Sequence, residues 1–179
     1  DIELRPLAER CLLGFGSVGG PPMLPVLYNN LKRIVQTDSH VMILTEMVHD
    51  ARVIRLNAEH RPSQLRSWMG DSVGHWEGDT LVVDTTNFVA NPALNGADEN
   101  LRVIERFKKE QDGSLLYSFR VEDPTVWTSA WEGDFPWPRT DDKVYEYACH
   151  EGNYALGNIM RGARLLEQDV EGAPSAGGE

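Results

Sequence analysis

Short apolar and β-branched segments recur along most of the chain, with polar or glycine-containing turns between them. This spacing is typical of a β-meander, in which each strand is followed by a turn and an antiparallel neighbour. The expected strands are residues 33–37, 40–46, 51–56, 80–86, 101–110, 114–122, 126–131 and 143–150. Residues 59–69 are more polar and predict, at most, a short helix over 63–68.

Two of the turns have the composition of a β-hairpin connection. Glu77-Gly78-Asp79 lies inside WMGDSVGHWEGDTLVVDTTNF (68–88), and Gln111-Asp112-Gly113 separates two later strands. Glycine tolerates the positive φ that tight hairpin turns require. Both segments therefore predict antiparallel pairs of strands.

One stretch, residues 154–166, has helical periodicity, because its apolar positions are Leu156, Ile159, Met160, Ala163 and Leu166. With seven to nine strands before it, the pattern predicts a mostly antiparallel, lipocalin-like β-barrel with a closing C-terminal helix; a β-sandwich is the alternative. We expect a Gly/Pro-rich irregular arm over 1–32, the barrel with its helix over 33–166, and a flexible acidic tail over 167–179.

The length and net charge of the chain limit the kinds of partner that it can bind. A chain of 179 residues fits a single domain, and its net charge of −11 at pH 7 argues against nucleic acid or an anionic membrane as partner. No apolar run reaches the length of roughly 18 residues that a membrane span needs. The chain begins at Asp1 rather than Met, which is expected if an upstream segment has been removed.

Two short motifs match the residue pattern of known functional motifs but lack the secondary structure that those motifs require. GFGSVG (14–19) fits the dinucleotide-binding pattern, but Pro21-Pro22 follows where a helix should begin. GDSVG (70–74) fits the nucleophile elbow of hydrolases, but it leads into a β-hairpin instead of a helix. Neither motif predicts a nucleotide site or a serine nucleophile here.

Histidines and carboxylates suggest a metal site only across strands. Glu46 and His49 have the Glu-x-x-His spacing, yet residues three apart on a strand point to opposite faces. A site that combines His49, His150 and a carboxylate is the alternative. We expect no metal and no cofactor.

The strongest anomaly is a carboxylate on a core face. In residues 101–109 the odd positions are Leu101, Val103, Glu105 and Phe107, so alternation places Glu105 inside. A buried charge needs a partner or takes up a proton. Glu46 poses a milder case beside Met42 and Leu44, and Arg52 is a candidate counter-ion. Two interpretations follow: a structural Glu–Arg ion pair, or a ligand-facing carboxylate in a barrel lumen.

Aromatic residues offer a second candidate surface. Trp131, Trp137, Tyr117 and Tyr147, together with Arg52, could line a pocket for a flat or apolar ligand, although aromatics on strands are more often plain core. Residues 131–137 hold two tryptophans with a glycine and a proline. We interpret this segment as a loop that forms the rim or lid of a pocket.

The only two cysteines, Cys11 and Cys149, stand 138 residues apart. If they are bridged, the closed loop stabilises the fold by roughly 5 kcal/mol in the chain-entropy model. If they are not, they are two buried thiols of the kind found in cytosolic proteins. The residues alone leave both states open.

Several segments together resemble a bacterial family of uncharacterised, exported β-rich proteins. These are the 68–88 motif, YEYACHEGN (145–153), Tyr28-Asn29-Asn30, residues 34–36, Val121-Glu122-Asp123-Pro124-Thr125 and Trp127. The resemblance implies a periplasmic or secreted protein and, with export, a Cys11–Cys149 disulfide. Family members are longer, with a secretion signal and an upstream segment. The family brings no reaction or catalytic residue.

Three functions are compatible with these observations. The first is a barrel that encloses a small organic molecule and performs acid–base chemistry as a lyase, isomerase or hydrolase, with Glu105 or Glu46 as base and His49 or His150 as partner. The second is a non-catalytic binding or carrier barrel. The third is a structural or assembly protein whose N-terminal arm docks on a neighbour, an upstream segment or another copy.

Overall fold

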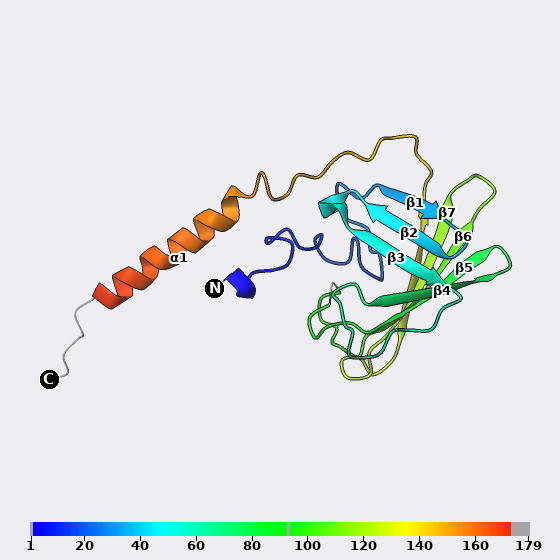
Figure 1. Ribbon diagram of the computed structural model, residues 1–179, viewed down its shortest axis with the longest axis horizontal. Coiled ribbons are helices and arrows are strands. Elements are labelled where there is room, and N and C mark those ends of the chain that lie inside the picture. Colours follow the sequence, from blue (N-terminus) through cyan, green and yellow to red (C-terminus); the bar gives the residue numbers. More distant parts are fainter. Residues whose placement is uncertain (1, 93, 173–179) are drawn as a thin grey trace.

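The computed structural model describes residues 2–92 and 94–172 and contains a single eight-stranded sheet (Figure 1). Its strands are β1 (Lys32–Gln36), β2 (His40–Thr45), β3 (Ala51–Leu56), β4 (Asp71–Glu77), β5 (Thr80–Thr86), β6 (Arg102–Lys109), β7 (Leu115–Glu122) and β8 (Trp131–Trp137). The helical elements are the 3₁₀ turns η1 (Ile2–Leu4) and η2 (Met47–His49) and the helix α1 (Tyr154–Gly172).

The strands follow one another in the sheet in chain order, as a meander does. All neighbouring pairs are antiparallel except β3 and β4, which are parallel. The parallel pair requires the chain to return along the sheet, and residues 57–70 make that crossing. The predicted hairpins at 77–79 and 111–113 are confirmed as the β4–β5 and β6–β7 connections.

The sheet curls strongly into a half-barrel, so β2 and β3 share one core with β5, β6 and β7. Alternation along the strands explains this core, because one side chain in two points inward. The inward residues include Val41, Ile43, Ile54, Val83, Val103 and Tyr117. The prediction of a mostly antiparallel β fold with a C-terminal helix is confirmed, and one curled sheet is present instead of the two sheets of a sandwich.

The half-barrel stays open between β1 and β8, which are its two edge strands. Within the described residues β1 pairs only with β2, and β8 pairs only with β7. The N-terminal arm crosses the interior at this open side: Met23 is buried in the core, and its N–H donates to the Tyr117 hydroxyl at 2.8 Å. We call the gap between β1 and β8 the seam.

The end of the sheet differs from the sequence prediction. Residues 131–137, expected to form a loop or lid, are the strand β8, while 126–131 and 143–150 form no separate strands. Proline is tolerated on an edge strand, where its missing N–H breaks no inner ladder, and Pro136 occupies such a place. Residues 143–150 alternate like a strand but pair with no strand of the sheet.

Two local predictions are also wrong. Residues 63–68 form turns instead of a helix, and the segment after Thr45 leaves the strand as the tight turn η2. Val48 and His49 both have positive φ, at 57° and 49°. Glu46 and His49 therefore lie in a turn and not on an extended strand.

The predicted helix is present and longer than expected, since α1 continues past Leu166 to Gly172. Asn153 caps it, because its Oδ1 accepts the Leu156 N–H at 3.3 Å. In Figure 1 the orange helix projects away from the sheet and does not close the barrel, and Leu165 and Leu166 are exposed. The extended segment before α1 leads the chain away from the sheet. Residues 173–179 of the expected acidic tail lie outside the described residues.

Candidate functional site

Glu105 of β6 is fully buried and pairs with Arg52 of β3, as face alternation predicts. Arg52 binds both carboxylate oxygens: Nη1 donates to Oε1 at 2.8 Å, and Nη2 donates to Oε2. Such a two-pronged contact is the strongest geometry that a guanidinium offers a carboxylate. The geometry is that of the structural ion pair inside the barrel.

Neutral polar groups complete the network around this pair. The Tyr117 hydroxyl donates to Glu105 Oε1 at 2.7 Å. Arg52 Nε donates to Ser72 Oγ at 3.0 Å, and its Nη2 donates to Thr85 Oγ1 at 2.9 Å. The oxygens of Ser72 and Thr85 lie 3.0 Å apart. Every charged atom therefore has a partner, as a buried ion pair requires.

The network is poorly suited to proton transfer. Burial, and then the neighbouring Glu105 carboxylate, raise the pKa of Tyr117 well above its usual value, so its hydroxyl keeps its proton and donates. Both oxygens of Glu105 already accept hydrogen bonds, from the Arg52 guanidinium and the Tyr117 hydroxyl. Among the described residues no histidine hydrogen-bonds to Glu105.

The other predicted catalytic residues lie elsewhere. Glu46 follows β2, and its Oε1 accepts the Tyr145 N–H at 3.2 Å. His49 in η2 and His150, just before α1, are both exposed, whereas Glu105 is not. The structure thus does not bring Glu105 together with His49 or His150 in one site.

Of the predicted ligand-binding residues, only Trp137 lines a cleft of substantial size. Tyr117 is buried in the core, Trp131 packs edge-on against Phe119, and Tyr147 packs against the small cluster around Met47. Arg52, held by Glu105, touches only a small cleft of about 240 Å³ beside Asp71. Neither Tyr117 nor Arg52 lines either of the two large clefts.

Two large clefts adjoin each other at β1: one lies at the end of the half-barrel formed by the β4–β5 and β6–β7 hairpins, and the other lies in the seam. One, of about 630 Å³, lies between β1–β2 and the β4–β5 and β6–β7 hairpins, with Val41, Ile43, Leu81 and Phe107 in its wall. The other, of about 610 Å³, lies between β1 and the end of β8, with Leu24, Phe135 and Trp137 in its wall. Ile34 and Leu115 line both clefts. We call the pair of clefts the seam groove.

Lys32, which the sequence analysis did not single out, lies in the second cleft. Its Nζ donates to the Val18 carbonyl oxygen at 3.2 Å and stands 5.3 Å from the centre of the Trp137 ring. Burial lowers the pKa of Lys32 from 10.5 to about 8. The available signal was strand alternation, since Lys32, Ile34 and Gln36 share one face of β1.

Asp71, at the start of β4, organises the small third cleft. Arg55 Nη2 donates to both of its oxygens, at 3.0 and 2.9 Å, and the Arg61 N–H donates to Oδ2 at 2.9 Å. Burial alone would raise the pKa of Asp71, but these bonds and one with His60 outweigh it and lower the pKa. The group fastens the loop before β4 to the parallel β3–β4 pair.

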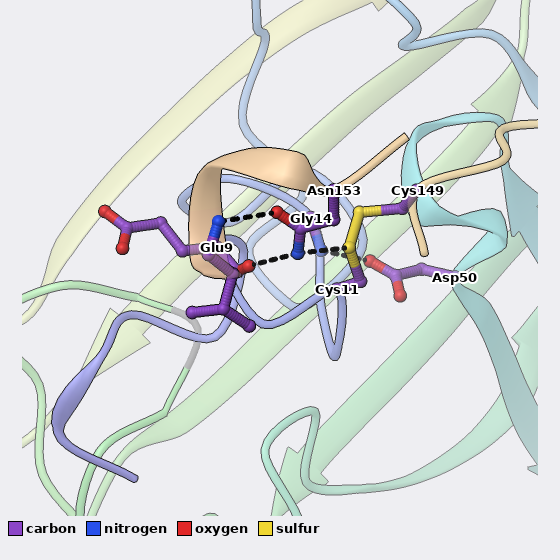
Figure 2. The surroundings of a disulfide bond; sticks show 7 residues. Glu9, Cys11, Gly14, Asp50, Cys149 and Asn153 are labelled. Carbon is purple, nitrogen blue, oxygen red and sulfur yellow. Dashed lines mark hydrogen bonds between the residues drawn. A yellow bond between two sulfur atoms is a disulfide. The ribbon is translucent and has the colours of Figure 1, made fainter. Parts of the chain in front are cut away.

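The N-terminal arm is fastened at its other end by the predicted disulfide, which is confirmed between Cys11 and Cys149 (Figure 2). Asn153 Nδ2 donates to the Glu9 carbonyl oxygen at 2.7 Å on the same patch. The Gly14 N–H donates to Asp50 Oδ2 at 2.8 Å. A Cβ at Gly19 would lie 2.6 Å from that oxygen, so the glycines of 14–19 allow the arm to wrap Asp50.

Asp50→Asn is expected to stabilise the protein at neutral pH. Burial raises the pKa of Asp50 from 3.8 to about 6, although the Gly14 bond and nearby His49 lower it. Between these values the folded chain holds more protons than the unfolded chain, so stability falls as pH rises from about 4 to about 6. The variant should gain about 2 kcal/mol at pH 7, less than the full shift because solvent screens part of the carboxyl group.

Urea unfolding across this pH range tests the expectation. The stability of the variant should not decrease between about pH 4 and about pH 6. At low pH the variant should be as stable as the parent, since Asn still accepts the Gly14 N–H. Asp38→Asn, which changes an exposed carboxyl in the β1–β2 turn, is the control and should leave the pH profile unchanged. Equal pH profiles for parent and Asp50→Asn would contradict the account.

Within residues 2–92 and 94–172, no cluster of three or more His, Cys, Asp or Glu side chains is placed to hold a metal ion. Among the same residues, no helix is long and apolar enough to cross a membrane. Comparisons with models of protein families, with curated proteins and with solved structures find no significant match to this chain.

Proposed function

We propose that this protein is a non-catalytic carrier that binds a small apolar molecule in the seam groove. The observation that carries the proposal is the meeting of two clefts of about 630 and 610 Å³ at Ile34 and Leu115. Binding sites for small molecules are typically concave and apolar, with a few polar groups that fix orientation. The seam groove has this composition, with Phe107, Phe135 and Trp137 in its walls.

The two other functions have less support. An acid–base enzyme would need a desolvated base that is free to take a proton, and Glu105 is saturated by Arg52 and Tyr117. An assembly role for the N-terminal arm would need the arm to be free to dock elsewhere. The arm is instead bonded to its own domain through Cys11, Gly14 and Met23.

Export is part of the proposal, with the periplasm or the extracellular medium as the site of action. The Cys11–Cys149 disulfide supports it, because such bonds persist in oxidising compartments. The motifs at 68–88 and 145–153 support membership of the exported bacterial family that they resemble. A lipocalin-like way of carrying ligands fits an open, curled sheet with an apolar groove.

Substitution of a groove residue tests the proposal with Nile red, a neutral apolar fluorophore, as the probe. Ile34→Glu should weaken Nile red binding at least about tenfold, since a carboxylate in the apolar wall must be desolvated by the bound probe. Val35→Glu is the matched control. Val35 is 43% exposed against 40% for Ile34, but it points from the opposite face of β1.

The measurement is a fluorescence titration of the parent and both variants, each shown by circular dichroism to be folded. Weaker binding for Ile34→Glu alone supports the seam groove. Equal affinities in all three proteins, or no binding by the parent, would overturn the proposal.

A further inference from the structure

Lys32 is a cation without a counter-ion at the edge of an apolar cleft. Within the described part of the chain no carboxylate lies within ion-pair distance of its Nζ, although the chain carries a net charge of −11. The ammonium has three donors. Among the described residues it donates one hydrogen bond, to the Val18 carbonyl oxygen, and it lies over the face of Trp137. A partly buried charge in this condition is destabilising unless a ligand pairs with it.

Groups from three segments partly bury Lys32. Trp137 of β8 lies on one side, the arm supplies the Val18 carbonyl and the apolar side chains of Met23 and Leu24, and Thr45 of β2 is the cross-strand partner. Burial is the cause of the lowered pKa of Lys32. An anion that reached Nζ here would form a charge-assisted hydrogen bond in a poorly hydrated place, where such bonds are strong.

The charges along the seam groove are distributed unevenly. The cleft of Lys32 also contains Arg139 and Asp142, from the segment after β8, which makes two cations and one anion. Arg139 Nη2 is 3.4 Å from Asp141, and Asp142 accepts the Thr140 hydroxyl at 2.7 Å. The other cleft contains Asp79, Lys109 and Glu110 at its margin, which makes one cation and two anions. An acidic group is therefore favoured in the first cleft and disfavoured in the second.

We propose that the ligand of the seam groove is an apolar monocarboxylate whose carboxylate binds Lys32 Nζ and whose apolar body passes Ile34 and Leu115 into the neighbouring cleft. This inference rests on the proposed function and narrows it to one class of ligand. Lys32 would orient the ligand, and the apolar walls would bind its body. The Trp137 face would hold the ammonium in place before the ligand arrives.

Isothermal titration calorimetry with decanoate and decanol tests apolar binding and carboxylate recognition separately. The two molecules have the same alkyl chain and differ in charge. The parent should bind decanoate at least about tenfold more tightly than decanol, the usual worth of a hydrogen-bonded charge. Lys32→Met should bring decanoate down to the affinity of decanol while leaving decanol binding unchanged within about threefold. Lys108→Met, which removes the same charge from an exposed position on β6, should alter neither affinity.

A second measurement follows the pH dependence of binding. Decanoate affinity in the parent should fall as pH rises from about 7 to about 9.5, because Lys32 loses its proton over this range, while decanol affinity stays level. The other charged groups facing this cleft are Arg139 and Asp142. Arg139→Gln and Asp142→Asn should retain the pH dependence, and Lys32→Met should abolish it.

The possible outcomes distinguish failure of the carboxylate inference from failure of the proposed apolar groove. Equal binding of decanoate and decanol by the parent would overturn the carboxylate inference and leave the apolar groove standing. A preference for decanoate that survives Lys32→Met, or that disappears in Arg139→Gln, would assign the anion to another group and overturn the role of Lys32. Binding of neither molecule would overturn both the inference and the proposed function.

Discussion

Glu105→Gln is expected to lower the free energy of unfolding by about 3–5 kcal/mol, because it leaves the buried Arg52 guanidinium without its counter-ion. In a domain of this length such a loss lowers the melting temperature by roughly 10 °C. The substitution keeps the shape of the side chain, so the effect comes from charge and hydrogen bonding and not from a cavity. Urea unfolding at neutral pH measures it.

Two further variants test whether the loss of stability is specific to the buried ion pair. Glu77→Gln removes the carboxylate of an exposed pair with Arg106 and should change stability little, because solvent screens that pair. Replacing both Arg52 and Glu105 by apolar residues of similar volume should cost less than Glu105→Gln alone. A stability of Glu105→Gln equal to that of the parent would show that the pair does not hold the interior together.

Loss of the disulfide is the second large expected effect. Changing Cys11 and Cys149 together to serine should lower the free energy of unfolding by about 2–5 kcal/mol, because the bond closes a loop across 138 positions and restricts the unfolded chain. The folded state should also lose order locally. Residues 9–19 and the segment before α1 meet at this bond, so their amides should exchange faster with solvent.

The comparison with reduced parent protein supplies the control. Dithiothreitol should destabilise the parent to the level of the double serine variant and leave that variant unchanged. Non-reducing mass spectrometry of the purified chain should show the Cys11–Cys149 linkage. Two thiols that react without denaturant, or a double variant as stable as the parent, would contradict the structural role of the bond.

The inner strands could be predicted from sequence because their two faces meet different surroundings. In β6 the buried residues Val103, Glu105 and Phe107 alternate with less buried ones, and this pattern fixes the register. The edges could not be predicted in the same way. Pro136 and Gly133 made β8 resemble a loop, and residues 143–150 resembled a strand, since local pattern does not show whether a segment pairs with the sheet.

Some residues of the site could be predicted from the pattern of a single strand, and others could not. Arg52 was foreseeable as the partner of Glu105, because a charge on a core face needs a counter-ion. The contribution of Tyr117, Ser72 and Thr85 depends on the register between distant strands, which no single segment reveals. Lys32 was hidden for a related reason: its cleft exists only because β1 and β8 remain apart.

The central claim is that ligand binds in the seam groove and not beside the buried Arg52–Glu105 pair. Methyl and indole NMR spectra recorded during a Nile red titration test it most directly. The account predicts that resonances of Ile34, Leu115 and Trp137 shift with bound probe, while those of Val83 and Val103, beside the Arg52–Glu105 pair, remain in place. Shifts confined to Val83 and Val103, with Ile34 and Leu115 unaffected, would contradict it and place the ligand beside the ion pair.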